Sequence, residues 1–215
     1  MTYYMDLLEK GGRGAYIALG VLALAVLFVV LQAVLAYGRG TSRSVARFLV
    51  VIACAGAAFY ATRIVGRAYF PNKTVGEVLK LSSTRFAPIM EAPASELLLP
   101  IAFVLIFFLL SLLAVIPFKL FCGIFGFSYE RNNGVTRGFA VLVGAVHGLF
   151  TLFILMLPIF GGMRMYERAA VEKPTSVVAD IYDRYFEDTV ESPLYKYPME
   201  FIGDRVMNEF AESTK

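Results

Sequence analysis

The sequence predicts an all-α, polytopic membrane protein with about four transmembrane helices and an amphipathic helical C-terminal tail. Of its 215 residues, 58% are hydrophobic, and the mean hydropathy of +0.67 is too high for an ordinary soluble domain. Four apolar runs approach the roughly 20 residues that cross the hydrocarbon core of a bilayer. The residues after the fourth run are mixed and charged, with apolar residues at helical spacing.

These patterns divide the chain into three parts. A short N-terminal segment covers residues 1–14, a four-helix transmembrane domain covers 15–162, and the amphipathic tail covers 163–215. Within the transmembrane domain, the spans are expected at about 15–37, 48–66, 97–118 and 138–160.

The first span has the length of a membrane helix, and Gln32 is its only strongly polar residue. A cleaved signal peptide would have a shorter apolar core and a small-x-small cleavage site after it. Here the polar sequence Gly38-Arg39-Gly40-Thr41-Ser42-Arg43-Ser44 follows instead. We therefore expect an uncleaved helix that leads into a tight turn.

The second span is rich in alanine and glycine, which favours burial between other helices. Arg63 and Arg67 near its end are expected to reach the membrane surface. Of the segment that follows, we expect one short amphipathic helix at about 74–81 and loop elsewhere. The third span is the most apolar. It has Pro100 in its first turn, where the missing amide costs least.

The fourth span carries a series of glycines that lie mostly on one side of a helix. Helices in lipid associate through close packing over small residues, and four-residue glycine spacing permits that packing. We therefore expect this span to grip another helix and to end around Pro158 and Gly161-Gly162. The glycines are Gly134, Gly138, Gly144 and Gly148.

The tail contains two sets of apolar residues at helical spacing, one beginning at Val177 and the other at Met199. Two amphipathic helices that lie against the membrane or against the bundle would satisfy this pattern. A separate small domain is not expected, because so few residues bury too little surface.

Basic residues in short loops mark the cytoplasmic side of a membrane protein. The loop over residues 38–47 carries Arg39, Arg43 and Arg47 and no acidic residue. We therefore expect this loop and the loop at 119–137 inside. Both termini and the long central loop are then outside.

Several function classes lack support in the sequence. The net charge of +3 gives no concentrated basic face, so we expect no nucleic-acid partner. The four spans contain no Asp or Glu, and the chain has no catalytic motif or metal-ligand spacing. We therefore expect no enzymatic activity, no metal and no cofactor. The lipid bilayer and other membrane-protein chains are the expected partners.

Two polar residues inside spans remain candidates for function. His147 is the only histidine and lies between two of the glycines. It could act as a pH sensor. The alternative, which we favour, is a neutral histidine that hydrogen-bonds a neighbouring helix. Gln32 offers a similar choice between an inter-helix hydrogen bond and a position near a helix end.

The turn Arg39-Gly40-Thr41-Ser42-Arg43 is the third candidate. Gly40 allows backbone angles that other residues resist. The two arginines fit topology anchors better than a site for a partner or a lipid.

Together these motifs resemble the colicin V production protein family (CvpA), small bacterial inner-membrane proteins of about four spans. The resemblance rests on Arg39-Gly40-x-x-Arg43 after the first span, and on Gly134-x-x-x-Gly138 and Gly144-x-x-x-Gly148 in the fourth. It covers about residues 16–160, and the tail does not match. It implies a bacterial inner-membrane accessory protein linked to toxin export, envelope integrity or biofilm formation.

Two hypotheses follow. The leading one is a non-enzymatic membrane scaffold or accessory factor that forms a homo-oligomer or binds other membrane proteins through the glycine face. The alternative is a small channel or transporter subunit, with Gln32 and His147 among the polar residues that line a pore.

Overall fold

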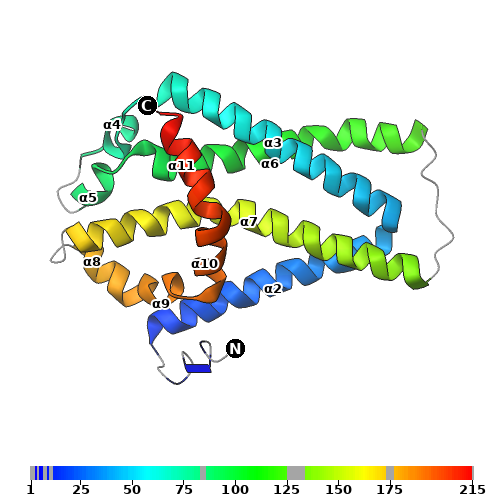
Figure 1. Ribbon diagram of the computed structural model, residues 1–215, viewed down its shortest axis with the longest axis horizontal. Coiled ribbons are helices and arrows are strands. Elements are labelled where there is room, and N and C mark those ends of the chain that lie inside the picture. The colour runs from blue at the N-terminus through cyan, green and yellow to red at the C-terminus, as the bar shows by residue number, and fades with distance from the viewer. Residues whose placement is uncertain are drawn as a thin grey trace. The chain divides into compact units, whose positions relative to one another are not determined.

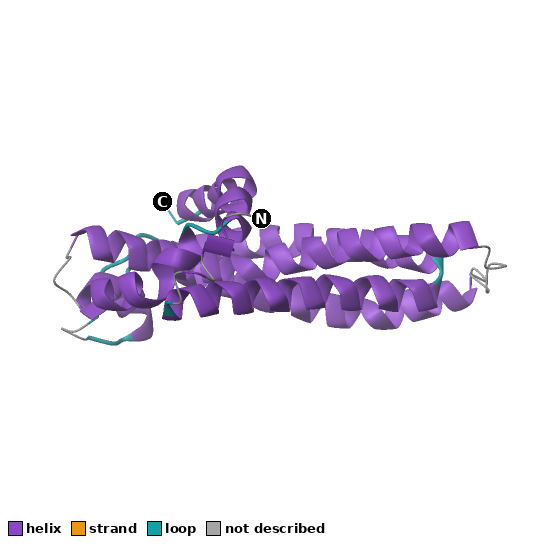
Figure 2. Ribbon diagram, turned by 90° about the horizontal axis from the view of Figure 1, so that it is seen from below, coloured by secondary structure: helices purple, strands orange, loops and turns teal. Residues whose placement is uncertain are grey.

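The computed structural model describes residues 3, 5, 6, 9, 12–82, 86–124, 134–172 and 177–214. Helices make up nearly all of this described chain, with short loops between them (Figures 1 and 2). Four of the described helices are long and apolar enough to cross a membrane. They confirm the all-α, multi-pass architecture. Their bounds are α2 Arg13–Arg39, α3 Thr41–Tyr69, α6 Ala94–Ile124 and α7 Gly134–Glu172.

Short helices occupy the central connection and the tail. The connection between α3 and α6 contains α4 (Val75–Leu79) and α5 (Ala87–Met90). The tail elements are α8 Val177–Ile181, the π-helical turn η1 Tyr182–Phe186, α9 Glu187–Val190, α10 Pro193–Pro198, the π-helical turn η2 Met199–Gly203 and α11 Asp204–Glu212.

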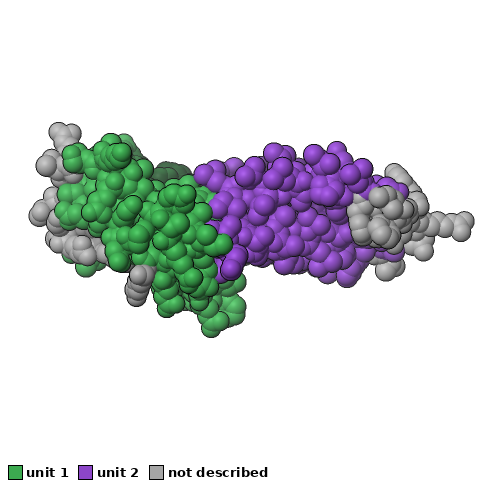
Figure 3. Space-filling model, turned by 90° about the horizontal axis from the view of Figure 1, so that it is seen from above, with its two compact units in different colours: residues 1–23, 62–102, 156–215 green, residues 24–61, 103–155 purple. Residues whose placement is uncertain are grey.

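The chain divides into two compact units, drawn in Figure 3. Unit 1 comprises Met1–Ala23, Thr62–Ala102 and Met156–Lys215, and unit 2 comprises Leu24–Ala61 and Phe103–Leu155. Each long helix contributes one segment to each unit. The tail therefore shares a unit with helix segments of the transmembrane region, and its apolar residues have a ready surface on which to pack.

The connection between α2 and α3 differs from the loop expected at residues 38–47. Only Gly40 lies outside the two helices, and its φ of 83° is in the left-handed region that glycine adopts without steric cost. The expected turn is thus confirmed at Gly40, and the expected loop around it is wrong. Thr41, Ser42 and Arg43 already belong to α3, because one left-handed residue suffices to reverse the chain.

The predicted short helix at 74–81 is confirmed as α4. The Thr74 hydroxyl accepts a bond from the amide of Glu77, and the Glu77 carboxylate accepts one from the amide of Thr74. This capping box satisfies two amides that the first helical turn leaves free. The expectation of loop elsewhere is wrong at α5, which has a proline near its start.

The fourth long helix does not end at Pro158 or at Gly161-Gly162, as expected, but continues to Glu172. Proline removes only one backbone donor, and packing on both sides holds the helix together. The glycines serve close packing. A Cβ on Gly161 would overlap the carbonyl oxygen of Glu96 in α6. We conclude that Gly161 allows α7 to approach α6 closely and that neither glycine terminates the helix.

Replacing Gly161 with alanine is therefore expected to destabilise unit 1. A Cβ there meets backbone, which cannot move aside as a side-chain end can, so we expect a loss of at least about 1–3 kcal/mol. Gly162→Ala is the matched control, because its Cβ would make only an ordinary 3.8 Å contact with Leu97. Thermal unfolding of the two purified variants in detergent tests this difference. Equal stability of both would contradict the packing role of Gly161.

Candidate functional site

Within unit 1, each long helix has one charged residue where its uncharged stretch begins or ends. The uncharged stretch of α2 begins after Arg13, and that of α6 begins after Glu96. The stretch of α3 ends at Arg63, and that of α7 ends at Arg164. A charged side chain in hydrocarbon is costly, so we expect the membrane core to end at these four residues in unit 1.

The tail contacts three of these four boundary residues with polar side chains. Arg13 donates from Nη1 to the hydroxyl of Tyr185 at 3.2 Å. Arg63 forms an ion pair with Glu209 at 3.1 Å. Arg164 forms an ion pair with Asp204 at 3.5 Å. Since one tail segment reaches these helices at their charged boundary, we call residues 177–214 the collar.

The collar also reaches the boundary of α6. Gly161 of α7 lies against the Glu96 carbonyl, and the methyl group of Met207 lies near the same point. Here α6, α7 and the collar meet in one contact. The collar therefore reaches all four boundary positions of unit 1.

Apolar burial holds the collar more strongly than its ion pairs do. The side chains of both ion pairs to Arg63 and Arg164 are one third to one half exposed, and such pairs contribute little. By contrast, the ring of Tyr195 packs edge-on against Phe160 of α7 at 5.0 Å. The apolar side chains of the collar that are buried are Val178, Ala179, Tyr195, Met199, Met207 and Phe210. The predicted amphipathic character of the tail is thus confirmed.

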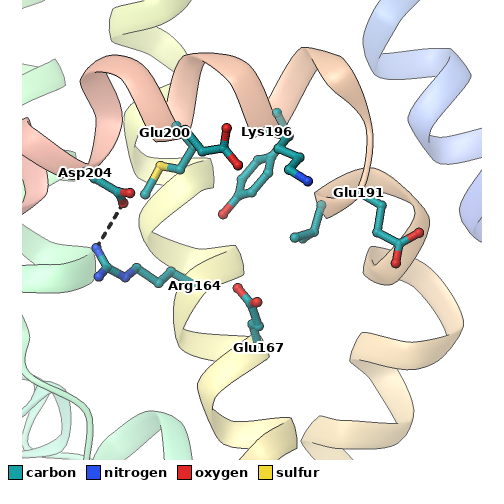
Figure 4. Close-up of a pocket in the computed structure, with 9 residues that line it drawn as sticks. Arg164, Glu167, Glu191, Lys196, Glu200 and Asp204 are labelled. Atoms are coloured by element: carbon teal, nitrogen blue, oxygen red, sulfur yellow. Dashed lines mark hydrogen bonds and ion pairs between the residues drawn. The ribbon is translucent and has the colours of Figure 1, made fainter. Parts of the chain in front are cut away.

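Between α7 and the collar lies a cleft of about 420 Å³. Figure 4 shows Arg164 and Glu167 extending from α7 toward the collar helix that carries Lys196, Glu200 and Asp204. The other residues that line the cleft are Val190, Glu191, Tyr195 and Met199. The lining carries four acidic and two basic side chains. Of these, Asp204 and Arg164 form an ion pair with each other.

The electrostatic field of this cleft acts on two collar tyrosines. Burial, and then the negative charge of Glu167, raise the pKa of the Tyr195 hydroxyl above its usual range. The same two causes raise the pKa of Tyr182 to about 12, with further contributions from Glu187 and Glu191. Both hydroxyls therefore stay protonated at neutral pH and can donate hydrogen bonds into an acidic surface.

The chemistry available in the cleft is that of ionic and hydrogen-bonded contact. Its described polar side chains are four carboxylates, two basic groups and a phenol, and Val190 and Met199 are its apolar ones. Among all described residues, no group of three or more His, Cys, Asp or Glu side chains could hold a metal ion. The polar groups that the cleft offers are thus charged side chains and one phenol.

Two of the sequence-predicted glycines form a helix contact inside unit 2. A Cβ on Gly144 would overlap the Cβ of Ala36 and lie 2.8 Å from the carbonyl oxygen of Gln32. One on Gly148 would lie 3.1 Å from the Cα of Val29. The glycine pair therefore packs against α2 of the same chain. The sequence predicted that the fourth span packs closely against another helix, and that helix is α2.

The other two glycines have different surroundings. A Cβ on Gly138 would meet nothing within 4 Å. Gly134 is the first residue of α7. Asn132 and Asn133, of a residue type that often caps a helix, precede it in the sequence and lie outside the described residues. The structure thus brings Gly144 and Gly148 together on one contact and leaves Gly138 apart from it.

The two polar candidates also take part in helix packing. The Cβ and Cγ of Gln32 lie over Gly148, at the contact of α2 with α7. His147 is buried, and its ring lies 5.9 Å from that of Phe48 in α3. Gln32 thus belongs to the contact of α7 with α2, and His147 belongs to the contact of α7 with α3. The role of His147 as a pH sensor stays a prediction.

The Arg39-Gly40-x-x-Arg43 turn lies close to the start of α7 in unit 2. Thr41, within the turn, donates its hydroxyl to the carbonyl of Thr136 at 2.5 Å. Arg137 donates to the hydroxyl of Tyr37 at 3.3 Å, and its guanidinium lies 5.3 Å from the centre of that ring. The turn motif thus borders a polar contact between α7 and the α2–α3 connection.

Sequence reasoning missed the collar as a site. The only signal in the sequence was that the tail contains acidic residues, which could pair with the arginines at the ends of the uncharged stretches. A linear sequence does not say which side chain of the tail meets which arginine, because the partners are 40 to 172 positions apart.

Comparisons of this chain with protein-family models, with curated proteins and with solved structures found no match. The resemblance to the colicin V production protein family therefore stays a prediction that rests on the two motifs quoted for it.

Replacing Gly144 with alanine is expected to weaken unit 2, whereas Gly138→Ala is expected to be tolerated. The first change forces a Cβ against Ala36 and the backbone of α2, at a cost of about 1–3 kcal/mol or more. The second adds a methyl group in open space and improves helix propensity by up to about 1 kcal/mol. Thermal unfolding of the purified proteins measures both. A tolerated Gly144→Ala would refute the close α2–α7 approach.

Alkaline pH is expected to loosen the collar. The pKa of Tyr182 and that of Tyr195 are raised, so the folded state keeps these protons while the unfolded state releases them from about pH 10 upward. Their stabilising contribution is complete below pH 10 and is lost as pH rises through about 12, the folded pKa of Tyr182.

Limited proteolysis of the tail across this pH range measures the loosening. The Tyr182→Phe and Tyr195→Phe variants keep the ring and have no proton to lose. We expect a smaller increase in alkaline cleavage for them than for the wild type. Identical pH profiles would show that these hydroxyls do not couple to the collar.

Proposed function

We propose that this protein is a non-enzymatic membrane scaffold or accessory protein of the bacterial inner membrane. The observation that supports this proposal most is the collar, which joins the ends of four membrane helices and adds a charged cleft beside them. An open, mixed-charge surface suits reversible protein contact, where charged groups steer association and fix orientation.

The proposed partner surface is the collar, and not the glycine face. Gly144 and Gly148 already contact α2 within the chain, so they are not available for a second chain unless unit 2 opens. In the cleft, by contrast, Glu167, Glu191, Lys196 and Glu200 are all exposed. With the orientation that the basic loops favour, the collar and both termini would lie on the outer side of the membrane.

The link to toxin export, envelope integrity or biofilm formation belongs to the same proposal and comes from the resemblance to the colicin V production family. The channel or transporter alternative needs a polar path through unit 2. Gln32 and His147, its proposed lining residues, lie at helix contacts. The scaffold is therefore the function that the geometry supports better.

Site-specific photocrosslinking in cells tests the scaffold. A photoreactive amino acid at Lys196, in the cleft, is expected to give a discrete crosslinked protein species. The matched control is the same amino acid at Leu112 of α6, which is 70% exposed on an apolar span and should give lipid adducts only. Combining the probe with Glu167→Gln and Glu200→Gln should lower the yield several-fold, because the charges of the cleft orient the partner.

Two outcomes would count against the scaffold. One is the absence of any protein adduct from position 196 in a variant that still folds. The other is solute or ion flux through proteoliposomes at high protein density, which would favour the channel alternative. A second copy of this chain as the adduct would instead identify the partner as a homo-oligomer.

A further inference from the structure

The collar exposes a patch of large apolar side chains on the side away from the helices it packs on. Phe201 is 78% exposed, Tyr197 is 68% exposed and Ile202 is 43% exposed. Their neighbours Met199 and Gly203 are buried. An exposed cluster of this kind on a helix with an otherwise buried apolar side indicates a second apolar contact. We call Tyr197, Phe201 and Ile202 the outer aromatic patch.

The η2 turn carries apolar residues on both of its sides. Pro198 has no amide to donate, and the turn that follows it is π-helical, closing from the amide of Asp204 to the carbonyl of Met199. Met199 and Gly203, which are four positions apart, lie on the buried side, while Phe201 and Ile202 remain exposed.

The outer aromatic patch lies at the charged boundary of α7. Just before it in the chain, Tyr195 packs on Phe160. Just after it, Asp204 pairs with Arg164, where the uncharged stretch of α7 ends. The patch is thus held between two contacts that both lie at the level where hydrocarbon gives way to water.

The residue types of the patch match that level. Tyrosine and other aromatic side chains are enriched in the headgroup region, where an apolar ring and a polar end are both accommodated. Lys196 and Arg205 are exposed on either side of the patch. Basic residues next to aromatic ones are typical of helices that lie in the membrane surface.

We infer that the outer aromatic patch inserts into the headgroup region of the same bilayer that the four long helices cross. The collar is then held from two directions. Met199, Met207 and Phe210 hold it to the helices, and the patch holds it to the lipid. This inference depends on the multi-pass architecture and is independent of the proposed scaffold function.

The chain contains no tryptophan, so a single Phe201→Trp variant gives a fluorescent reporter without background. The full-length variant would be reconstituted into vesicles of phosphatidylcholine and phosphatidylglycerol. We expect blue-shifted emission, quenched strongly by lipids brominated near the headgroup and weakly by lipids brominated at the end of the acyl chain.

Val177→Trp is the matched control, because Val177 is also an exposed apolar residue of the collar. Figure 1 places α8 near the end of α7. At about 1.5 Å per residue, Glu172 lies about 12 Å beyond the boundary residue Arg164. Emission from the Val177→Trp variant should therefore be red-shifted and unaffected by brominated lipid.

A third variant tests whether the rest of the patch holds the reporter in the lipid. It combines Phe201→Trp with Tyr197→Ser and Ile202→Ser, which remove the other two apolar side chains of the patch. This variant should lose most of the quenching by brominated lipid while keeping its thermal unfolding profile.

Two results would overturn the inference. Emission from the Phe201→Trp variant that matches emission from the Val177→Trp variant would place the patch in water. Blue-shifted emission that resists brominated lipid and weakens as the protein-to-lipid ratio falls would show that a second copy of the chain covers the patch.

Discussion

The cost of a charge in hydrocarbon organises this protein. Arg13, Arg63, Glu96 and Arg164 cannot enter the apolar core without a large penalty, so in unit 1 they stand where that core ends. The collar attaches at the same level, with Tyr185, Glu209 and Asp204 supplying polar partners for the three arginines. These contacts are weak individually, since they are partly exposed. These contacts align the tail with the ends of the helices. The burial of Met207 and Phe210 then stabilises the tail in that position.

Glycine permits a close approach between two helices in each unit. In unit 2, Gly144 and Gly148 let α7 approach the backbone of α2, and in unit 1, Gly161 lets α7 approach α6. In lipid, apolar side chains gain little by leaving their surroundings, so the attraction between helices comes from close atomic contact. A glycine next to a neighbouring backbone provides that contact directly. The helix α7 thus makes one such close contact in each unit.

The fold was largely predictable because hydropathy and length are local properties. The four long helices and the capped helix α4 followed from residues close together in the sequence. Helix ends were less predictable. Pro158 and Gly161-Gly162 carry the usual marks of a terminus, yet distant packing against Glu96 and Leu97 keeps the helix continuous. The collar was beyond sequence reasoning for the same reason. Which arginine meets Asp204 depends on how the chain folds back, and no local pattern encodes that.

The single-residue connection at Gly40 has a consequence for how the protein enters the bilayer. One residue spans at most about 3.6 Å, so the end of α2 and the start of α3 lie at the same face of the bilayer. Arg39 and Arg43, on the two sides of Gly40, are therefore gathered there as one block of positive charge. The two helices are thus oriented as a pair, because the basic residues that decide the direction of both stand in the same place.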